Sequence, residues 1–300
     1  MLLRIFSWTV FPLTLGGAIA WALARMDAGV EPHVAIFPAL IAANALVAVL
    51  ERVVPLHRSW LHDRGDLRVD AGLALTVAAL TGWLGRVMAP LGVATAASMG
   101  AGIGLALWPS EWPILAQLVL ALVVAELPKY WVHRLEHEWP PLWRIHATHH
   151  SAERLYWLNA ARFHPLDIGL DYVVGAGTLL LLGAGDAVLA LFLLFGAVHG
   201  IFQHANLPLR CGPLNWFFSM AELHRWHHVP VTETANHNYG QNLIVWDVVF
   251  GTRYLPKDAL PTEDIGLDGL PAFPKGFWAN LLVPFRWRRV EREAAAHPVG

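Results

Sequence analysis

The chain has 300 residues, of which 56% are hydrophobic and 15% are charged, with a formal net charge of −2 when histidine is neutral. Soluble domains are about 45–50% apolar and about 25% charged, so this composition excludes an ordinary soluble domain and a disordered chain. The charge balance gives no basic surface for nucleic acid, and the single Cys211 excludes an intrachain disulfide and a CxxC metal site.

Long apolar runs follow one another through the first two thirds of the chain. One helix needs about 20 apolar residues to cross the hydrocarbon core of a bilayer. The runs occupy residues 5–24, 33–50, 69–85, 112–125, 172–185 and 187–203. The last two are short and form either two crossings or a hairpin that does not fully traverse. The sequence therefore predicts an all-α integral membrane protein with four to six transmembrane helices.

Lysine and arginine predict the orientation of these spans, because short cytoplasmic loops are enriched in them. Residues 51–68 carry four arginines and residues 25–32 carry one. The N-terminus and 51–68 are therefore expected in the cytoplasm, and the uncharged stretch 87–110 on the outer side. Counting onward places 129–165 and 204–300 in the cytoplasm. The first run is too long for a signal peptide and is predicted to be a retained span.

Histidines are concentrated in the second half of the chain, where 12 of the 16 lie between residues 133 and 237. His133 and His137 are four residues apart, so on a helix they share a face. Two HxxHH segments follow, and each is predicted to present its three histidines on one helical face. Their members are His146, His149 and His150 in the first segment, and His224, His227 and His228 in the second.

This pattern predicts a metal centre. Eight imidazoles on three helical faces would repel one another if protonated and would lack partners if buried, and a metal ion removes both difficulties. Eight or nine ligands suffice for two ions with about four imidazoles each, and neither a thiolate nor a clear carboxylate set accompanies them. Imidazole suits zinc, copper, iron and nickel alike. A redox-capable pair of ions in a lipid-facing bundle indicates oxygen chemistry on a lipid chain.

Across residues 125–256 the sequence resembles the fatty acid hydroxylase/sterol desaturase superfamily of membrane di-iron oxygenases. The segments that carry the resemblance are, in order, HRLEH, HATHHSAERLYWLNAARFHP, QHANLPL, ELHRWHH, NYG and WDVVFGTRY. The resemblance implies a helical catalytic bundle capped on its cytoplasmic side, with two non-haem irons held by histidines. The ligands it implies are His133, His137, His146, His149, His150, His204, His224, His227 and His228.

Four further residues are candidates for an additional ligand or for a contact with a ligand: His199, His164, His237 and Asn238. His199 and His204 are five residues apart, which on a helix separates them by about 140°. They cannot both face one metal pair without a break in the helix. We therefore expect His204 to be a ligand and His199 to lie beside the site or in a channel. His164, in Phe-His-Pro, is expected to form structural hydrogen bonds.

The resemblance implies an oxidoreductase that uses O2 and external electrons to hydroxylate or desaturate a C–H bond of a lipid of the sterol, fatty acyl, hopanoid or carotenoid class. The sequence has no flavin, nicotinamide or haem-attachment fingerprint. A ferredoxin or cytochrome with its reductase is therefore the expected donor. Four arginines are candidates to dock the donor or to hold lipid head groups, or they are ordinary cytoplasmic-side charges: Arg134, Arg144, Arg154 and Arg225.

Two other classes of function remain open at this stage. Residues 133–137 also fit the HxxEH motif of a zinc metalloprotease, with Glu136 as the base. A non-enzymatic membrane metal carrier is the second, although a carrier places its ligands near the middle of the bilayer. The metal content distinguishes the three classes: the oxygenase would hold two irons, the protease one zinc, and the carrier an exchangeable metal.

The sequence predicts three regions. Residues 1–110 are expected to form N-terminal membrane spans, 111–256 a catalytic domain of the fatty acid hydroxylase/sterol desaturase type, and 257–300 a cytoplasmic tail. Within the tail, 276–286 is amphipathic and suited to the membrane interface. The many tryptophans and the Ala, Arg and Gly bias favour a bacterial inner membrane, and the oligomeric state is not predicted.

Overall fold

The computed structural model describes residues 2–103, 107–257, 263–267, 269–270 and 273–296. Within these ranges the regular structure is helical, apart from one isolated bridge between Phe218 and Leu243. The α-helices are α1 (Leu2–Asp27), α2 (Pro32–Ala35), α3 (Phe37–Val53), α4 (Leu67–Ile103), α5 (Ile114–Glu138), α6 (Pro140–His150), α7 (Pro165–Leu182), α8 (Asp186–His204), α9 (Ala221–His227), α10 (Thr232–Ala235), α11 (Val245–Phe250), α12 (Phe277–Leu282) and α13 (Trp287–Ala296). Four short 3-10 helices join them: η1 (Arg58–Leu61), η2 (Trp157–Ala161), η3 (Gly212–Trp216) and η4 (Pro284–Arg286).

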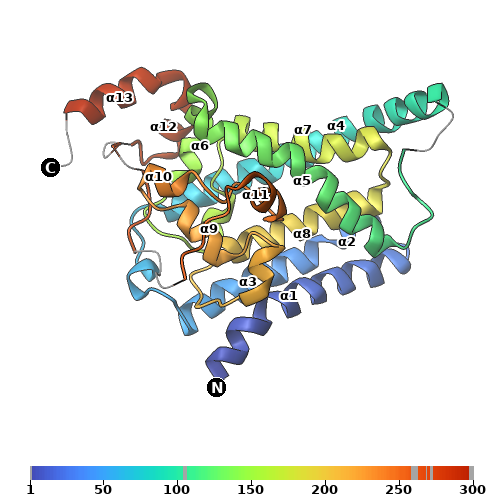
Figure 1. Cartoon of the computed structure of the whole chain (residues 1–300), viewed down its shortest axis with the longest axis horizontal. Coiled ribbons are helices and arrows are strands. Elements are labelled where there is room, and N and C mark those ends of the chain that lie inside the picture. The colour runs from blue at the N-terminus through green and yellow to red at the C-terminus, as the bar shows by residue number, and fades with distance from the viewer. Residues whose placement is uncertain (1, 104–106, 258–262, 268, 271–272, 297–300) are drawn as a thin grey trace.

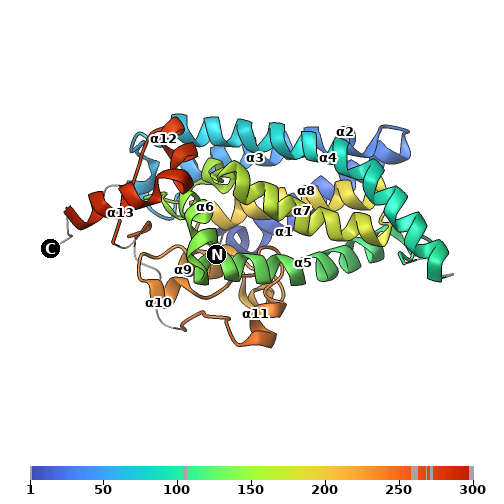
Figure 2. The ribbon, with the colours of Figure 1, turned by 90° about the horizontal axis from the view of Figure 1, so that it is seen from above.

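Six stretches are long and apolar enough to cross a membrane: Leu3–Asp27, Pro32–Val53, Leu67–Gly92, Ile114–Glu138, Pro165–Leu182 and Asp186–His204. They lie side by side along the long axis of the molecule (Figures 1 and 2). α8 is the central helix, with 72% of its span buried, whereas only 6% of the span of α4 is buried. The exposed apolar side chains of the outer helices suit lipid as solvent. The chain is an integral membrane protein with six candidate spans.

Two helices differ from the expected runs. The second run is divided at Ile36, because Pro38 stands in the first turn of α3 and lacks an amide hydrogen. The third run was expected to end near Gly85, but α4 continues to Ile103. Residues 93–103 are rich in alanine, which has the highest helix propensity, and carry no charge. The ribbon of α4 bends before its end, which fits the proline at position 90 (Figure 2).

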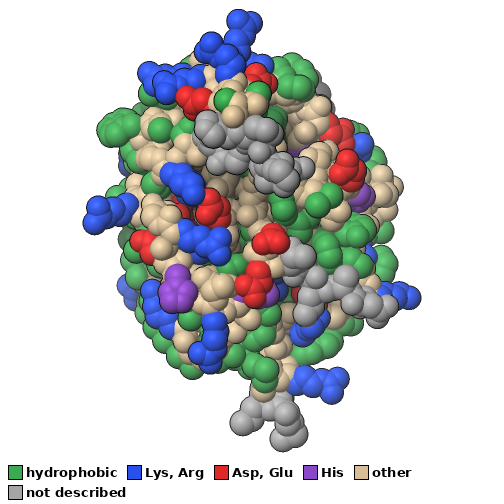
Figure 3. Space-filling model, turned by 90° about the vertical axis from the view of Figure 1, so that its left-hand side faces the viewer, with side chains coloured by type: hydrophobic (Ala, Val, Ile, Leu, Met, Phe, Trp, Pro, Cys, Tyr) green, Lys and Arg blue, Asp and Glu red, His purple; other side chains and the backbone are tan. Residues whose placement is uncertain are grey.

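The cap lies at one end of the bundle, where α5 and α8 end. α5 stops at Glu138, and Pro140 begins α6 at once, so the chain turns across the end of the bundle. α6 and α9–α13 gather at this end (Figure 1). Figure 3 looks onto it and shows charged side chains of both signs spread over the surface. This end is therefore the water-facing end of the molecule.

Candidate metal centre

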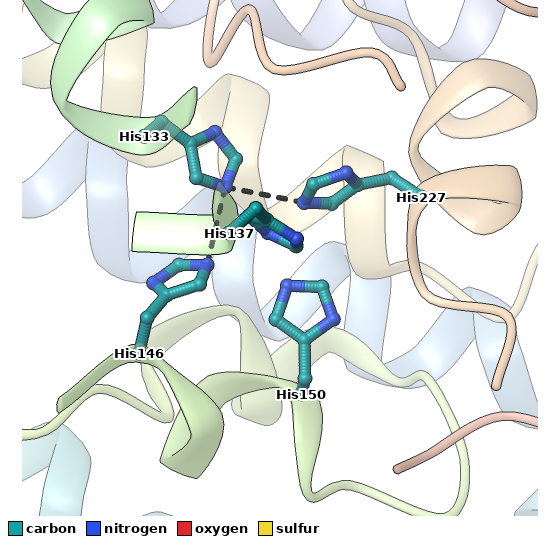
Figure 4. Close-up of side chains that lie close together, drawn as sticks. All are labelled: His133, His137, His146, His150 and His227. Carbon is teal, nitrogen blue, oxygen red and sulfur yellow. Dashed lines mark hydrogen bonds between the residues drawn. The ribbon is translucent and has the colours of Figure 1, made fainter. Parts of the chain in front are cut away.

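Nine histidines form two groups where the cap meets the bundle. The first, called the five-histidine group, consists of His133, His137, His146, His150 and His227 (Figure 4). The second, called the four-histidine group, consists of His149, His204, His224 and His228. Within each group the candidate ligand atoms lie within 4.8 Å of one another. All nine residues predicted as ligands are thus brought together, divided as five and four rather than about four each.

The two HxxHH segments each contribute to both groups, although the three histidines of the first segment lie on one buried face with ring centroids 4.9–5.4 Å apart. His146 and His150 of α6 belong to the five-histidine group, and His149 belongs to the other. In the second segment, His224 and His228 belong to the four-histidine group and His227 to the five-histidine group. Residues i and i+4 stay together, whereas residue i+3 is rotated by about 100° from residue i+4. This crossed arrangement holds the two groups side by side.

Hydrogen bonds at Nδ1 fix the tautomer of most of these imidazoles. His133 donates from Nδ1 to the carbonyl of Tyr239 (2.6 Å), and His227 donates to that of His237 (2.8 Å). A carbonyl oxygen can only accept, so Nδ1 carries the hydrogen and Nε2 keeps a free lone pair. Further Nδ1 atoms face oxygen acceptors in the same way, namely His149 to Arg162 O, His204 to Asn159 Oδ1, His137 to Asn236 Oδ1 and His146 to Asp167 Oδ2.

In the five-histidine group, three Nε2 atoms converge without hydrogens between them, because the Nδ1 atoms of these rings face acceptors. His133 Nε2 lies 3.1 Å from Nε2 of both His146 and His227. Facing lone pairs at this distance repel unless a cation lies between them, so this donor set fits a bound metal ion. In the other group, His224 Nε2 lies 2.9 Å from that of His204 and 3.0 Å from that of His228, and these converging nitrogens offer a second site.

Burial keeps these imidazoles neutral, which is the form that binds a metal. Removal from water, with a smaller contribution from neighbouring histidines, lowers the pKa of His227 to about 3. The same causes hold the pKa of the other cap histidines well below its usual range: His146, His149, His150, His224 and His228. In addition, Nε2 of His137 and His150 and Nδ1 of His224 and His228 are buried without a hydrogen-bond partner.

Two carboxylates lie against the five-histidine group, and the sequence had indicated only Glu136, as the base of the zinc protease alternative. Asp167 Oδ2 is 3.0 Å and Glu136 Oε2 is 3.5 Å from Nδ1 of His146, and both residues are buried. The expectation of no carboxylate set is therefore wrong. The only signal in the sequence was Glu136 inside the HRLEH segment, since Asp167 is 21 residues from His146 in the chain and is brought there by α7.

The NYG and WDVVFGTRY segments support His133 from behind. Asp247 accepts hydrogen bonds from the backbone amides of Tyr239 and Gly240 and from the hydroxyl of Thr252. These bonds hold the turn whose Tyr239 carbonyl orients His133. Asp247 is a second functional residue that the sequence reasoning did not single out.

The four additional candidates lie outside both groups. His199 is fully buried among Phe11, Phe195 and Phe218. His164 caps α7 by accepting from Leu166 N and also bonds the carbonyl of Leu281, in keeping with a structural role. His237 contacts the site through its carbonyl, which accepts from His227. The side chain of Asn238 forms hydrogen bonds with the backbone of Leu223 and Tyr254. The backbone of Asn238 itself has a positive φ of 58°.

Two of the four candidate docking arginines are buried, and that hypothesis is wrong for them. Arg154 forms a bidentate pair with Asp66, and Arg225 donates to the carbonyls of Ala205 and Leu207. Both side chains tie loops to the bundle. Arg134 is partly exposed and pairs with Glu138.

A cavity of about 230 Å³ leads to the five-histidine group from the cap. His137 and His150 form part of its wall, together with Trp143, Asn236 and Leu267. The wall is mixed in character, with apolar side chains beside amide and imidazole groups. It gives the five-histidine group an approach that the bundle helices do not close.

The geometry does not suit the zinc protease alternative. A catalytic zinc has three protein ligands and a water that the glutamate activates, whereas His133 and His137 belong to a group of five. Glu136 lies beside Nδ1 of His146, on the side of that ring away from the other imidazoles. The carrier alternative fits no better, because the ligands gather at one end of the spans.

Comparison with known proteins gives a consistent family. The fatty acid hydroxylase family model matches residues 118–252. An ornithine lipid hydroxylase of Rhizobium tropici is 40% identical over 252 residues, covering 80% of this chain and 72% of that protein. The human alkylglycerol monooxygenase is 30% identical over 48% of this chain and 31% of its own length.

A methylsterol monooxygenase of Rattus norvegicus is 27% identical over 48% of each chain. No solved structure matches the chain. The match to the ornithine lipid hydroxylase covers more than two thirds of both proteins. The chain belongs to the fatty acid hydroxylase family of oxidoreductases.

Proposed function

We propose that the chain is a membrane-bound di-iron monooxygenase that hydroxylates a C–H bond of a lipid. The observation that carries this proposal is the pair of adjacent histidine groups, whose Nε2 atoms approach one another to 2.9–3.1 Å where the cap meets the bundle. The family relation supports a lipid as substrate.

The number of nitrogen donors favours a pair of ions over a single zinc. One zinc uses three or four protein ligands, whereas nine imidazoles in two adjacent groups suffice for two ions. Imidazole suits iron as well as zinc, and oxygen chemistry on a lipid would require the redox-capable metal.

The protein residues prepare the site for this chemistry. The acceptors at Nδ1 aim the Nε2 atoms inward, and burial keeps the imidazoles neutral. The bound iron pair supplies the activation of O2 and the attack on an unactivated C–H bond. Overall, one oxygen atom enters the lipid as a hydroxyl group, and the other leaves as water after two electrons and two protons are taken up.

The electrons come from outside the chain, and we propose a ferredoxin-type or cytochrome-type donor with its reductase. The cap, with its mixed charges, is the surface such a donor would approach (Figure 3). We further propose that the cap faces the cytoplasm and that the protein resides in a bacterial inner membrane, in keeping with the arginine-rich residues 51–68.

For the substrate, we propose an ornithine lipid or a related acylated amino-acid lipid. The support is the 40% identity to an ornithine lipid hydroxylase over 80% of this chain. Sterols, fatty acyl chains, hopanoids and carotenoids are the other classes that the test covers.

Mass spectrometry of membrane lipids tests the proposal. The wild-type chain and His149→Ala are expressed in a bacterium that makes ornithine lipids and is grown under isotopically heavy O2. A lipid that gains one heavy oxygen only with the wild type is the expected product. Loss of two hydrogens without oxygen would indicate a desaturase, and unchanged lipids with a protein that holds two irons would contradict the proposal.

A further inference from the structure

Two carboxylates lie behind His146, on the opposite side of its ring from the converging Nε2 atoms. Asp167 Oδ2 accepts from His146 Nδ1 at 3.0 Å, and Glu136 Oε2 lies 3.5 Å from the same nitrogen. Each carboxylate is 1% exposed. Asp167 comes from the first turn of α7 and Glu136 from α5, so three helices meet at this imidazole.

Five of the other eight clustered histidines have neutral partners at Nδ1. The acceptors are backbone carbonyls for His133, His149 and His227, and side-chain amide oxygens for His137 and His204. In the part of the chain that the structure describes, His146 is the one candidate ligand whose Nδ1 faces a carboxylate. The two histidine groups are therefore unequal in charge as well as in ligand number.

This difference has a direct chemical consequence. A carboxylate that accepts the Nδ1–H bond fixes the tautomer and raises the basicity of Nε2, and such partners change metal affinity by about 10–100-fold. A buried negative charge also attracts a divalent cation more strongly than it would in water. Both effects act on the five-histidine group.

We propose that Asp167 is a positioning residue that acts through His146 and makes the five-histidine group the tighter of the two iron positions. Glu136 of α5 lies against the same nitrogen from the second side. The inference rests on the di-iron function proposed above. It adds the order in which the two irons bind and leave, because the five-histidine position fills first and releases its iron last.

If the role of Asp167 were purely structural, its loss would change the stability of the protein and not the affinity for iron. An acidic side chain in the first turn of a helix interacts favourably with the helix dipole, which contributes about 0.3–1 kcal/mol. Loss of that interaction would lower the thermal stability of the protein with or without metal. It would not weaken one iron position and spare the other.

The substitution Asp167→Asn separates the two roles, because asparagine keeps the size and one acceptor oxygen but removes the charge. Asp171→Asn is the matched control. It removes a charge one helical turn further along α7, where Asp171 pairs with Lys129 at 3.1 Å rather than with His146. Asp167→Glu restores a carboxylate and should restore the wild-type behaviour.

The measurement is the iron retained by the purified, iron-loaded protein as an Fe(II) chelator is titrated in the absence of oxygen. We expect the wild type to lose iron in two steps. In Asp167→Asn the later step should move to about 10–100-fold lower chelator concentration, while the first step and the melting temperature of the metal-free protein stay unchanged. Asp171→Asn should leave both steps in place.

Three results would overturn the inference: a later step that does not move in Asp167→Asn, an equal movement of both steps, or the same movement in Asp171→Asn. The failure of the proposed function looks different, since it is a wild-type protein that never holds two irons. A wild type that releases two irons in two steps, with Asp167→Asn unchanged, refutes the role of Asp167 alone.

Discussion

His204 and His199 lie on the same helix, but their surroundings differ. His204 Nε2 is 2.9 Å from His224 Nε2, whereas His199 packs 5.4 Å, ring to ring, from Phe11 and belongs to neither histidine group. We predict that His204→Ala lowers the iron content from two toward about one per chain, because the four-histidine group loses a ligand. His199→Ala should keep both irons. Elemental analysis of the two purified variants checks this, and the reverse ranking would mean that the ligand assignment on α8 is wrong.

Asp247 offers a test of the support behind His133. Asp247→Ala leaves the amides of Tyr239 and Gly240 without their acceptor, and each unpaired buried amide costs about 1–3 kcal/mol. We expect a clear fall in melting temperature together with weaker iron retention, since the Tyr239 carbonyl no longer orients His133. Asp247→Asn keeps one acceptor oxygen and should show a smaller change. Equal melting curves for wild type and Asp247→Ala would contradict this role.

At the scale of helices, the segment of α12 and η4 matches the expected amphipathic piece at 276–286. Trp278 and Phe285 are 74% and 73% exposed. Phe277 packs on Gly72, near the start of the span in α4. An aromatic face at the level where a span begins suits the membrane interface, and exposed arginines follow in α13.

We predict that the side chain of Phe285 inserts into the lipid, whereas that of Arg289 in α13 remains in water. Spin labels at Phe285→Cys and at Arg289→Cys, each in a Cys211→Ser background and reconstituted in bilayers, provide the measurement. The label at 285 should collide more with O2 than with a water-soluble nickel chelate, and the label at 289 should show the opposite preference. Equal access of the chelate to both positions would mean that η4 lies in the aqueous phase.

The sequence predicted the helices and the set of clustered histidines more fully than the way they assemble. Uncharged runs and HxxxH spacings are local patterns. An uncharged run predicts a helix in lipid, because lipid favours apolar side chains, and an HxxxH spacing predicts a metal site, because neutral imidazole binds metals. The crossed contribution of each HxxHH segment depends on how α6 and α9 face each other, which no local spacing contains. Asp167 became a partner of His146 only because α7 packs against α5 and α6, and a lone aspartate after Phe-His-Pro carries no signal of that.

For the whole molecule, the position of the cap relative to the membrane decides which partners reach the metal centre. Arginine counts predict a cytoplasmic cap, and the native Cys211 cannot report on it because the residue is buried, with 3% exposure. Glu233 on α10 and Glu111 before α5 are exposed at opposite ends of the bundle.

We predict that a cysteine introduced in Glu233→Cys reacts with a membrane-impermeant maleimide only after the inner membrane is permeabilised. A cysteine in Glu111→Cys should react from the periplasmic side without permeabilisation. The opposite pattern would reverse the orientation and remove the argument for a cytoplasmic electron donor.

The central claim is that the two histidine groups hold a pair of iron ions, and the iron content of the purified chain tests it most directly. We expect two irons per chain in the wild type, with losses in both His227→Ala, which removes a ligand of the five-histidine group, and His149→Ala, which removes one of the four-histidine group. A wild type with a single zinc and no iron, or two variants that both keep the full iron content, would contradict the account.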